Sequence, residues 1–281
     1  MKKLKEGIQE EKPKKEGRFS SPLAENCFSD EERLFNALSK KCSEELRYAF
    51  RALNRERREN LSEREREDVD KKLIEEVTNS SEKGVFNALL QGADPNAVEK
   101  EVSGYPVIIL AIFRDSEALV RLLINAGADL QKKIELPKHV IASVDQGRDA
   151  LIKAAAHKKE KIVKMLLEEG ANPNSTDDVG LTALYEAAVN ESMECIKYLE
   201  SHYANPFIET EGKLLSDIIE EKKFSKEIVK EIRNYEKMFI KSARKVRLFP
   251  ALASRKEKEF ALLYSLMVCD KKTAKKAIEY L

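Results

Sequence analysis

The side chains best suited to covalent or metal chemistry are few and scattered in this chain. They are His139, His157 and His202, together with Cys27, Cys42, Cys195 and Cys269. No two of them have the short spacing that a zinc site needs, and no cysteine pair forms a C-x-x-C motif. The sequence therefore predicts no metal site and no catalytic residue.

The glycine motifs that hold phosphates or expose a nucleophilic serine are also missing from the sequence. Neither G-x-x-x-x-G-K-[ST] nor G-x-G-x-x-G occurs, and there is no G-x-S-x-G turn. Carboxylate pairs are frequent, but 50 of the 281 residues are Asp or Glu, so such pairs carry no signal. We therefore expect no enzyme activity and no cofactor.

Charge and cysteine usage limit the partners and the compartment. Lys and Arg number 51 against 50 acids, so no overall field attracts nucleic acid, and no nucleic-acid partner is expected. Scattered cysteines are typical of reduced thiols in the cytoplasm. No apolar signal segment follows the first residues, and the longest apolar run, 107–113, is short of the ~20 residues of a membrane span. We expect a cytoplasmic protein, with export into a host cell cytosol as the alternative.

A repeated sequence motif, called the phrase below, indicates which part of the chain forms a binding surface. Gly-Ala followed by Asp or Asn closes an apolar stretch at 92–96, 127–130 and 170–174, and Tyr203 replaces the glycine in a fourth copy. A second set of glycines, which precedes the apolar stretches, has spacings of 43, 33 and 32 residues: Gly104, Gly147, Gly180 and Gly212. A period of this size indicates a solenoid, and solenoids bind through extended surfaces.

Two helices are expected in each repeat. The first follows the opening glycine and ends in small residues, which let a neighbouring repeat pack closely. The second has apolar residues at i, i+3 and i+4, as in 120–124, 163–167 and 196–199. The glycine of the phrase suits the left-handed position that ends a helix, and the Asx-Pro pair then turns the chain.

These residues resemble the ankyrin repeat, whose pattern is G-x-T-P-L-H-x-A-A, then V-x-x-L-L-x-x-G-A, then D/N-x-N. The resemblance covers about residues 70–236 and is fullest at 147–179 and 180–211. The histidine of the family pattern is replaced by Ile109, Ile152 and Tyr185. The resemblance implies an all-α solenoid of helix-turn-helix repeats with hairpin loops. It also implies a non-enzymatic module that binds an unidentified protein partner.

Four segments are expected along the chain. They are a disordered Lys/Glu-rich tail at 1–28, an N-terminal helical segment at 29–68, a repeat domain of about five units including caps at 69–236, and a C-terminal helical segment at 237–281. A capping box at Ser29 predicts where the first helix begins. The helices that follow form either a hairpin or a degenerate extra repeat. Residues 55–72, rich in Arg and Glu, predict one solvated helix with i,i+4 ion pairs.

The resemblance also implies which residues bind the partner, because ankyrin arrays bind on a concave face of hairpin tips and first helices. By position, the candidates at the tips are Val102, Ser103, Tyr105, Asp145, Gln146, Arg148, Asp178, Val179 and Leu181, and those on the helices are Phe113, Arg114, His157, Val189 and Asn190. Tyr105, Phe113 and Arg114 have the residue types of an interface anchor. Core packing is the alternative for Phe113, and a simple exposed helix end is the alternative for His157.

Two irregularities carry further hypotheses. About ten extra residues within 131–146 lengthen one hairpin finger, either as part of the binding face or as a tolerated surface insertion, since doubling a loop costs only ~0.6 kcal/mol. The stretch 237–258 has eight Lys/Arg and one Glu. It either contacts an anionic membrane or caps the array with a basic exposed face. The second functional hypothesis is an ankyrin-targeted effector that an intracellular bacterium delivers into host cells, with the basic C-terminal helices acting on a membrane or host complex.

Overall fold

The computed structural model describes residues 23–100, 104–135, 145–210 and 212–248. These residues form twelve helices and no strand. The helices are α1 Leu23–Leu38, α2 Glu44–Glu59, α3 Glu63–Thr78, α4 Glu82–Leu90, α5 Val107–Phe113, α6 Glu117–Ala126, α7 Ala150–Ala156, α8 Glu160–Glu168, α9 Ala183–Val189, α10 Met193–Ser201, α11 Leu215–Glu221 and α12 Lys226–Leu248.

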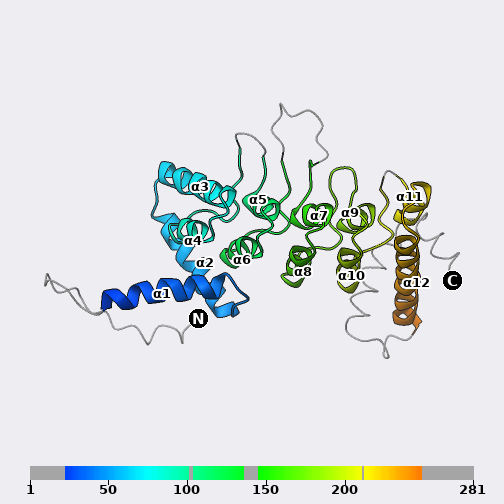
Figure 1. The fold of residues 1–281 in the computed structure, drawn as a ribbon, viewed down its shortest axis with the longest axis horizontal. Helices are drawn as coiled ribbons and strands as arrows, with labels where there is room; N and C mark the ends of the chain where they lie inside the picture. Colours follow the sequence, from blue (N-terminus) through cyan, green and yellow to red (C-terminus); the bar gives the residue numbers. More distant parts are fainter. Residues whose placement is uncertain (1–22, 101–103, 136–144, 211, 249–281) are drawn as a thin grey trace.

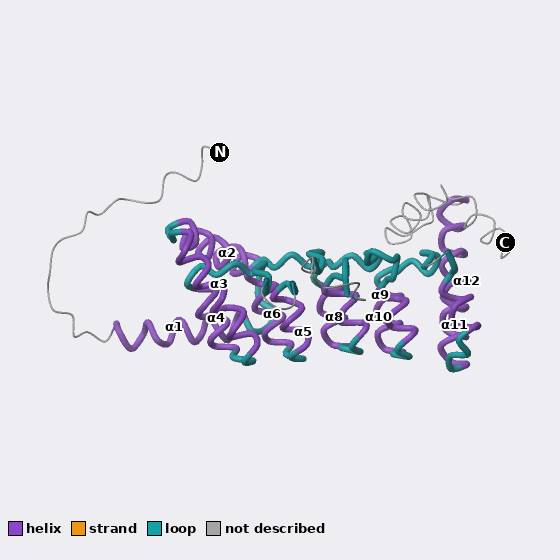
Figure 2. The backbone as a smooth tube through the Cα atoms, turned by 90° about the horizontal axis from the view of Figure 1, so that it is seen from above, coloured by secondary structure: helices purple, strands orange, loops and turns teal. Residues whose placement is uncertain are grey.

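Helices α3 to α12 form five antiparallel pairs that stand side by side. The first helices, α3, α5, α7, α9 and α11, make one row, and the second helices make another (Figure 1). The connecting loops follow one edge of the array (Figure 2). The all-α solenoid predicted from the sequence is therefore confirmed.

Each loop between pairs is a short hairpin finger that leads into a first helix. Single antiparallel bridges join Val98 to Pro106 and Thr176 to Thr182. In the lengthened finger, the Ile134 amide donates to the Arg148 carbonyl at 2.9 Å, and the Gly147 amide donates to the Ile134 carbonyl at 3.0 Å. The base of this finger is thus paired, as the bases of the other fingers are. Residues 136–144 of this finger lie outside the described residues.

The core is continuous from the first helix to the last. Apolar side chains from Leu38 in α1 to Ile240 in α12 belong to a single buried cluster. Fully buried alanines lie where neighbouring first helices meet, as the small residues in the sequence predicted: Ala111, Ala154, Ala155, Ala187 and Ala188. Because the alanine side chains are short, adjacent first helices pack closely, as α7 and α9 do.

The replaced glycine keeps the conformation of the others. Gly127 ends α6 with φ of 100°, in the left-handed region. Tyr203, at the matching position after α10, has φ of 63°. A residue with a side chain adopts this conformation at a cost of roughly 1–2 kcal/mol. The shape of the repeat therefore prevails over the local preference of Tyr203.

Helices α1 and α2 pack on the second helices α4 and α6 rather than extending the stack. Phe50 of α2 is 2% exposed and stacks on Phe86 of α4, with ring centroids 6.2 Å apart. Phe35 of α1 meets the edge of the same ring at 5.5 Å. The N-terminal helices are thus neither a further repeat nor a separate unit.

One polar face of α2 binds the carboxyl ends of successive second helices. The Asn54 amide donates to the carbonyl of Leu89 in α4 at 2.6 Å and to that of Ala93 after α4 at 2.9 Å. The Arg51 guanidinium donates to the carbonyls of Ile124 and Asn125 in α6, at 2.9 and 3.1 Å. The last carbonyls of a helix lack the regular amide partner four residues further on, and cations are favoured at that end of a helix dipole.

The same face of α2 reaches a third repeat. Arg47 makes a bidentate ion pair with Glu169, which ends α8, and this hydrogen bond lowers the pKa of Glu169. Arg47, Arg51, Asn54 and Arg58 recur at helical spacing and therefore lie along one side of α2. We call this helix with these four side chains the α2 brace.

Three boundaries differ from the sequence expectations. Helix α1 begins at Leu23 and continues through Ser29, because Leu, Ala and Glu favour helix before the predicted start. The single helix expected over 55–72 breaks at 60–62, where Ser62 forms a capping box that begins α3. Helix α12 runs across the expected boundary at 236.

Helix α12 packs against the last complete repeat. The Tyr235 hydroxyl donates to the Ala204 carbonyl at 2.6 Å, and the Phe239 ring meets Phe207 at 5.9 Å. Tyr235 and Phe239 are almost fully buried. The described part of the C-terminal helical segment is therefore a cap on the array.

Changing Glu200 to Gln should stabilise the protein by about 1–2 kcal/mol near pH 8, with little effect near pH 4. Burial and the nearby Glu231 carboxylate raise the pKa of Glu200 to about 7. A carboxyl with a raised folded-state pKa contributes fully when protonated, and this contribution is lost as the pH rises through 7. Urea denaturation of both proteins at the two pH values measures the difference. An equal gain at both pH values would contradict this assignment.

Candidate functional site

Three aromatic side chains from adjacent repeats meet on the first-helix side of the array. Tyr105 comes from the finger before α5, Phe113 ends α5, and His157 follows α7. The Tyr105 and Phe113 ring centroids are 5.4 Å apart, and the His157 ring meets Phe113 edge-on at 5.1 Å. We call these three residues the aromatic cluster. The sequence named all three as candidates.

The Phe113 ring is held firmly yet remains accessible. It is 37% exposed, so the core alternative for Phe113 is wrong. The ammonium of Lys153, which is 4% exposed, lies 5.0 Å from the Phe113 centroid and 5.9 Å from that of Tyr105. A cation over an aromatic face is attracted by the ring quadrupole. Lys153 therefore contacts both rings and helps to hold them.

Asp145 at the end of the lengthened finger joins the cluster to that finger. The Tyr105 hydroxyl donates to Asp145 at 2.6 Å, and the Lys153 ammonium donates to it at 2.8 Å. Burial opposes ionisation, but these two hydrogen bonds lower the pKa of Asp145. Burial and the contact with Asp145 raise the pKa of Tyr105 to about 12. The phenol thus stays protonated and keeps donating.

His157 is a neutral member of the cluster near neutral pH. Burial first, and then the Lys153 ammonium, lower the pKa of His157 below its usual value. A neutral imidazole next to Phe113 adds aromatic surface without a charge. His157 itself is exposed, so a partner can reach it.

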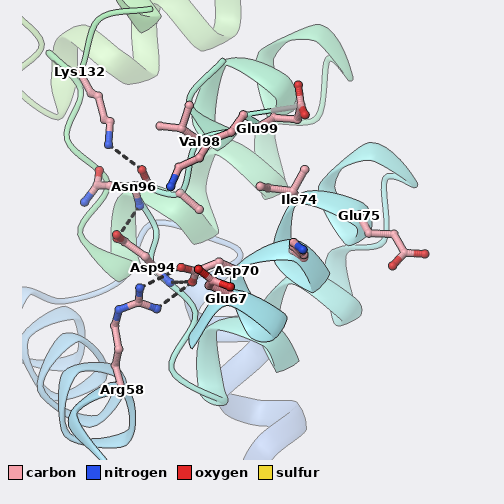
Figure 3. Close-up of a pocket in the computed structure, with 13 residues that line it drawn as sticks. Arg58, Glu67, Asp70, Ile74, Glu75, Asp94, Asn96, Val98, Glu99 and Lys132 are labelled. Atoms are coloured by element: carbon pink, nitrogen blue, oxygen red, sulfur yellow. Dashed lines mark hydrogen bonds and ion pairs between the residues drawn. The ribbon is translucent and has the colours of Figure 1, made fainter. Parts of the chain in front are cut away.

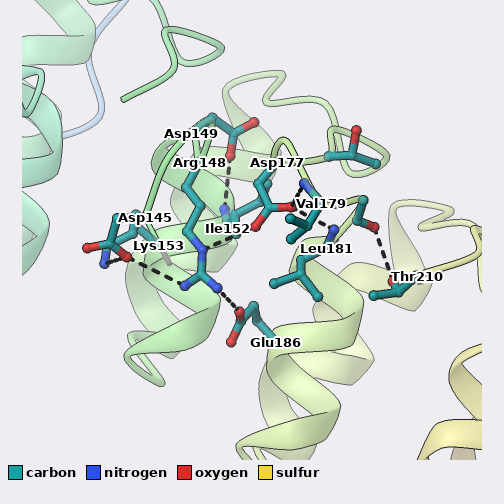
Figure 4. A network of polar contacts seen from close by, with 12 residues as sticks. Asp145, Arg148, Asp149, Ile152, Lys153, Asp177, Val179, Leu181, Glu186 and Thr210 are labelled. Carbon is teal, nitrogen blue, oxygen red and sulfur yellow. Dashed lines mark hydrogen bonds and ion pairs between the residues drawn. The ribbon is translucent and has the colours of Figure 1, made fainter. Parts of the chain in front are cut away.

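A buried ion network, drawn in Figure 4, is joined to the cluster through Asp145, which contacts both Tyr105 and Arg148. Arg148 is 7% exposed, and its guanidinium donates to Glu186 of α9 and to Asp177 of the next finger, the latter at 3.3 Å. Its third ion pair is with Asp145 at 3.7 Å. Burial raises the pKa of Glu186, and this effect outweighs the attraction of Arg148, which lowers it. Arg148 thus binds two fingers and a helix together.

The network also shapes the next finger. One carboxylate oxygen of Asp177 accepts from the amides of Val179 and Leu181 at 3.1 and 2.8 Å. Gly147 lies so close that a β-carbon there would come within 2.1 Å of the Asp178 carboxylate. The two fingers therefore support each other through backbone contacts and a shared arginine.

Known protein families account for this repeat geometry. The family model for ankyrin repeats in three copies matches residues 77–177 and, in an overlapping match, residues 131–210. Residues 77–210 are ankyrin repeats. The helices on either side of them are not matched. Ankyrin repeats are typically non-enzymatic, which fits the lack of catalytic motifs in the sequence.

Curated relatives share the ankyrin repeats over part of their length. The human SH3 and multiple ankyrin repeat domains protein 2 is 31% identical over 119 residues, 42% of this chain and 6% of that protein. An ankyrin repeat-containing protein of Treponema pallidum (strain Nichols) is 31% identical over 114 residues, 41% of this chain and 35% of its own length. An intracellular phospholipase A2 of Caenorhabditis elegans is 28% identical over 138 residues, 46% of this chain and 12% of its length. The chain thus spans between 6% and 35% of these relatives.

The other sequence candidates are placed around the cluster in different ways. Val102 and Ser103 lie outside the described residues. Arg114, Gln146 and Asp178 are exposed, and Val179 is 59% exposed at the tip of the next finger. Leu181, Val189 and Asn190 are half-buried. Because Arg148 is buried, a partner would contact the fingers that it holds rather than its guanidinium.

Two lysines that sequence reasoning missed belong to the site. Lys153 lies one helical turn before His157, and this i,i+4 spacing places the two side chains on the same side of α7. Lys158 follows His157 directly and is exposed. The charged composition hides both, because lysines occur throughout the chain.

A hollow of about 670 Å³ lies between α3 and the first finger (Figure 3). Some of its charged groups are paired with one another or with the backbone. Arg58 pairs with Asp70 at 2.8 Å, and the Lys132 ammonium donates to the Asn96 carbonyl at 2.8 Å. Within the described residues, no group of His, Cys, Asp or Glu is arranged to hold a metal ion. The hollow offers no exposed aromatic ring comparable to Phe113.

The described residues include no helix that is both long and apolar enough to cross a membrane. The proposed membrane contact through 237–258 is not tested by the structure, because residues 249–258 lie outside the described residues. Met238 is 48% exposed on α12. The membrane contact and the effector hypothesis that depends on it stay predictions.

Proposed function

We propose that this chain is a non-enzymatic protein-binding module that docks one protein partner on the first-helix face of its ankyrin repeats, at the aromatic cluster. The ankyrin repeats support the protein-binding role in general. The exposed and rigidly held Phe113 ring supports this particular position. A cytoplasmic setting is part of the proposal, and the free thiols of Cys42 and Cys195 are consistent with it.

The observation that carries the proposal is the pre-organisation of Phe113. Its ring lies between Tyr105 and His157 and over Lys153, so little side-chain freedom is left to lose when a partner binds. Interface hot spots are commonly aromatic side chains with such support, and pre-organisation improves affinity by lowering the entropic cost. The neighbouring ion network keeps the two fingers at fixed positions.

Changing Phe113 to Ala should reduce partner recovery at least tenfold, which corresponds to about 1.4 kcal/mol or more. Proximity labelling with the intact chain in its native cell identifies the partners, and affinity capture with purified protein measures recovery. Tyr48→Ala is a matched control, because Tyr48 is 78% exposed on α2, away from the cluster. Circular dichroism confirms that both variants are folded. Equal recovery by the wild-type chain and Phe113→Ala would rule out this docking position.

A further inference from the structure

We infer that the partner segment covering the aromatic cluster is an acidic peptide segment, with Asp or Glu side chains beside the apolar side chain that contacts Phe113. This inference rests on the proposed function and adds the chemistry of the partner. It is based on the charged side chains around the cluster. Some of them form ion pairs within the chain, and others do not.

Two exposed cations flank the cluster. Arg114 follows Phe113, and Lys158 follows His157, at the turns that end two adjacent first helices. Among the described residues, neither side chain has a carboxylate partner. Both positive charges therefore stand at exposed positions next to Phe113 and His157 in the sequence.

Three acidic groups near these cations are already paired within the chain. Asp115 forms an ion pair with Lys159 at 2.9 Å. Asp145 binds Lys153 and Tyr105, and Glu186 binds Arg148. A carboxylate arriving from a partner would therefore meet the uncompensated positive charges of Arg114 and Lys158.

The same turn carries cations further along the array. Lys222 ends α11 and Lys223 follows it, and both are exposed. Between them and Lys158, the carboxylate of Glu191 accepts from the Ser225 amide at 3.0 Å. We call Arg114, Lys158, Lys222 and Lys223 the basic strip. Helices pack about 8–10 Å apart and an extended chain advances about 3.3 Å per residue, so about ten residues would follow the strip.

A peptide fits this surface better than a nucleic acid does. Proteins that bind single-stranded nucleic acid stack successive bases on several exposed rings. Among the described residues of this face, Phe113 is the exposed large aromatic side chain. A single aromatic anchor next to separated cations suits one apolar side chain flanked by carboxylates.

Selection from a random library tests the inference without knowing the partner. Phage displaying random peptides of about 12 residues are selected on the full-length chain, and each clone is then tested on Phe113→Ala. Clones that lose binding to Phe113→Ala should be enriched in Asp and Glu over Lys and Arg. Neutral or basic sequences among these clones overturn the inference while leaving the proposed function intact. A complete lack of Phe113-dependent clones overturns both.

Charge reversal provides the second arm. The double variant Arg114→Glu with Lys158→Glu should bind a selected acidic peptide at least about fivefold more weakly, as expected for two charges at the rim of an interface. The control, Arg55→Glu with Arg64→Glu, makes the same change in net charge at exposed positions on α2 and α3. Equal weakening in both double variants overturns the inference. Displacement of the peptide by oligouridylate at a lower concentration than by the peptide itself also overturns it.

Discussion

Changing Arg148 to Ala should lower the free energy of unfolding by about 3–5 kcal/mol at pH 7. The guanidinium is almost completely buried and pairs with Glu186, Asp177 and Asp145. Removing one member of a buried ion network leaves the remaining charges without compensation, and this costs more than the net worth of the network. Urea denaturation of the purified chain measures the loss.

The loss should depend on pH in a defined direction. Burial already raises the pKa of Glu186, and removal of Arg148 should raise it further. Lowering the pH to about 4 protonates this carboxyl and relieves the penalty, so the difference between Arg148→Ala and the wild-type chain should shrink. Arg114→Ala, at an exposed arginine, should change stability by less than about 0.5 kcal/mol. A loss below about 1 kcal/mol for Arg148→Ala would show that the network does not hold the fingers.

The second large effect concerns the α2 brace. Phe50→Ala should cost about 3–5 kcal/mol, because it removes a buried aromatic ring and leaves a cavity beside Phe86. Tyr48→Ala, two residues away on the same helix, should cost less than about 0.5 kcal/mol because its ring is 78% exposed. The same denaturation assay compares the two variants.

Hydrogen exchange then shows how far the effect spreads. Solenoid repeats normally couple only to their neighbours, but the brace contacts the ends of α4, α6 and α8 together. In Phe50→Ala, the amides of α4 and α6 should therefore lose protection together, while those of α11 change least. A loss confined to α1 and α2 would mean that the brace does not support the repeats.

Local signals in the sequence were sufficient to predict the repeats. The spacing of Gly147, Gly180 and Gly212, together with apolar residues at helical spacing, reports on contacts within one repeat and with the next. Such contacts recur in every unit, so each copy confirms the others. The buried alanines of the first helices, such as Ala154 and Ala187, follow from the same pattern.

The α2 brace was not predictable in this way. Arg51 and Asn54 bind carbonyls 73 and 35 residues further along the chain, and backbone carbonyls leave no mark in a sequence. Their neighbourhood is rich in Arg and Glu, which also suits a solvated helix. The break before α3 did have a local signal, since Ser62 and Glu65 form a capping box.

The sequence predicted which face of the array the candidate residues occupy, but not how deeply each of them is buried. The resemblance placed Tyr105, Phe113 and His157 on one face, and the structure brings their rings together. It also placed Arg148 at a finger tip, where the structure shows it buried between two fingers. Burial of a charged side chain depends on partners such as Asp177 and Glu186 from the next repeat, and their approach is a property of the assembled array.

The α2 brace has a consequence for the order in which the chain folds during synthesis. Helix α2 leaves the ribosome before every second helix that it binds. Its partners are then made in sequence, at separations of 35, 73 and 122 residues from Asn54, Arg51 and Arg47. Contacts of such high sequence separation slow folding. The helix would dock progressively from its carboxyl end, so that Arg47 near its amino end reaches its final contact only after the repeat containing α8 is complete.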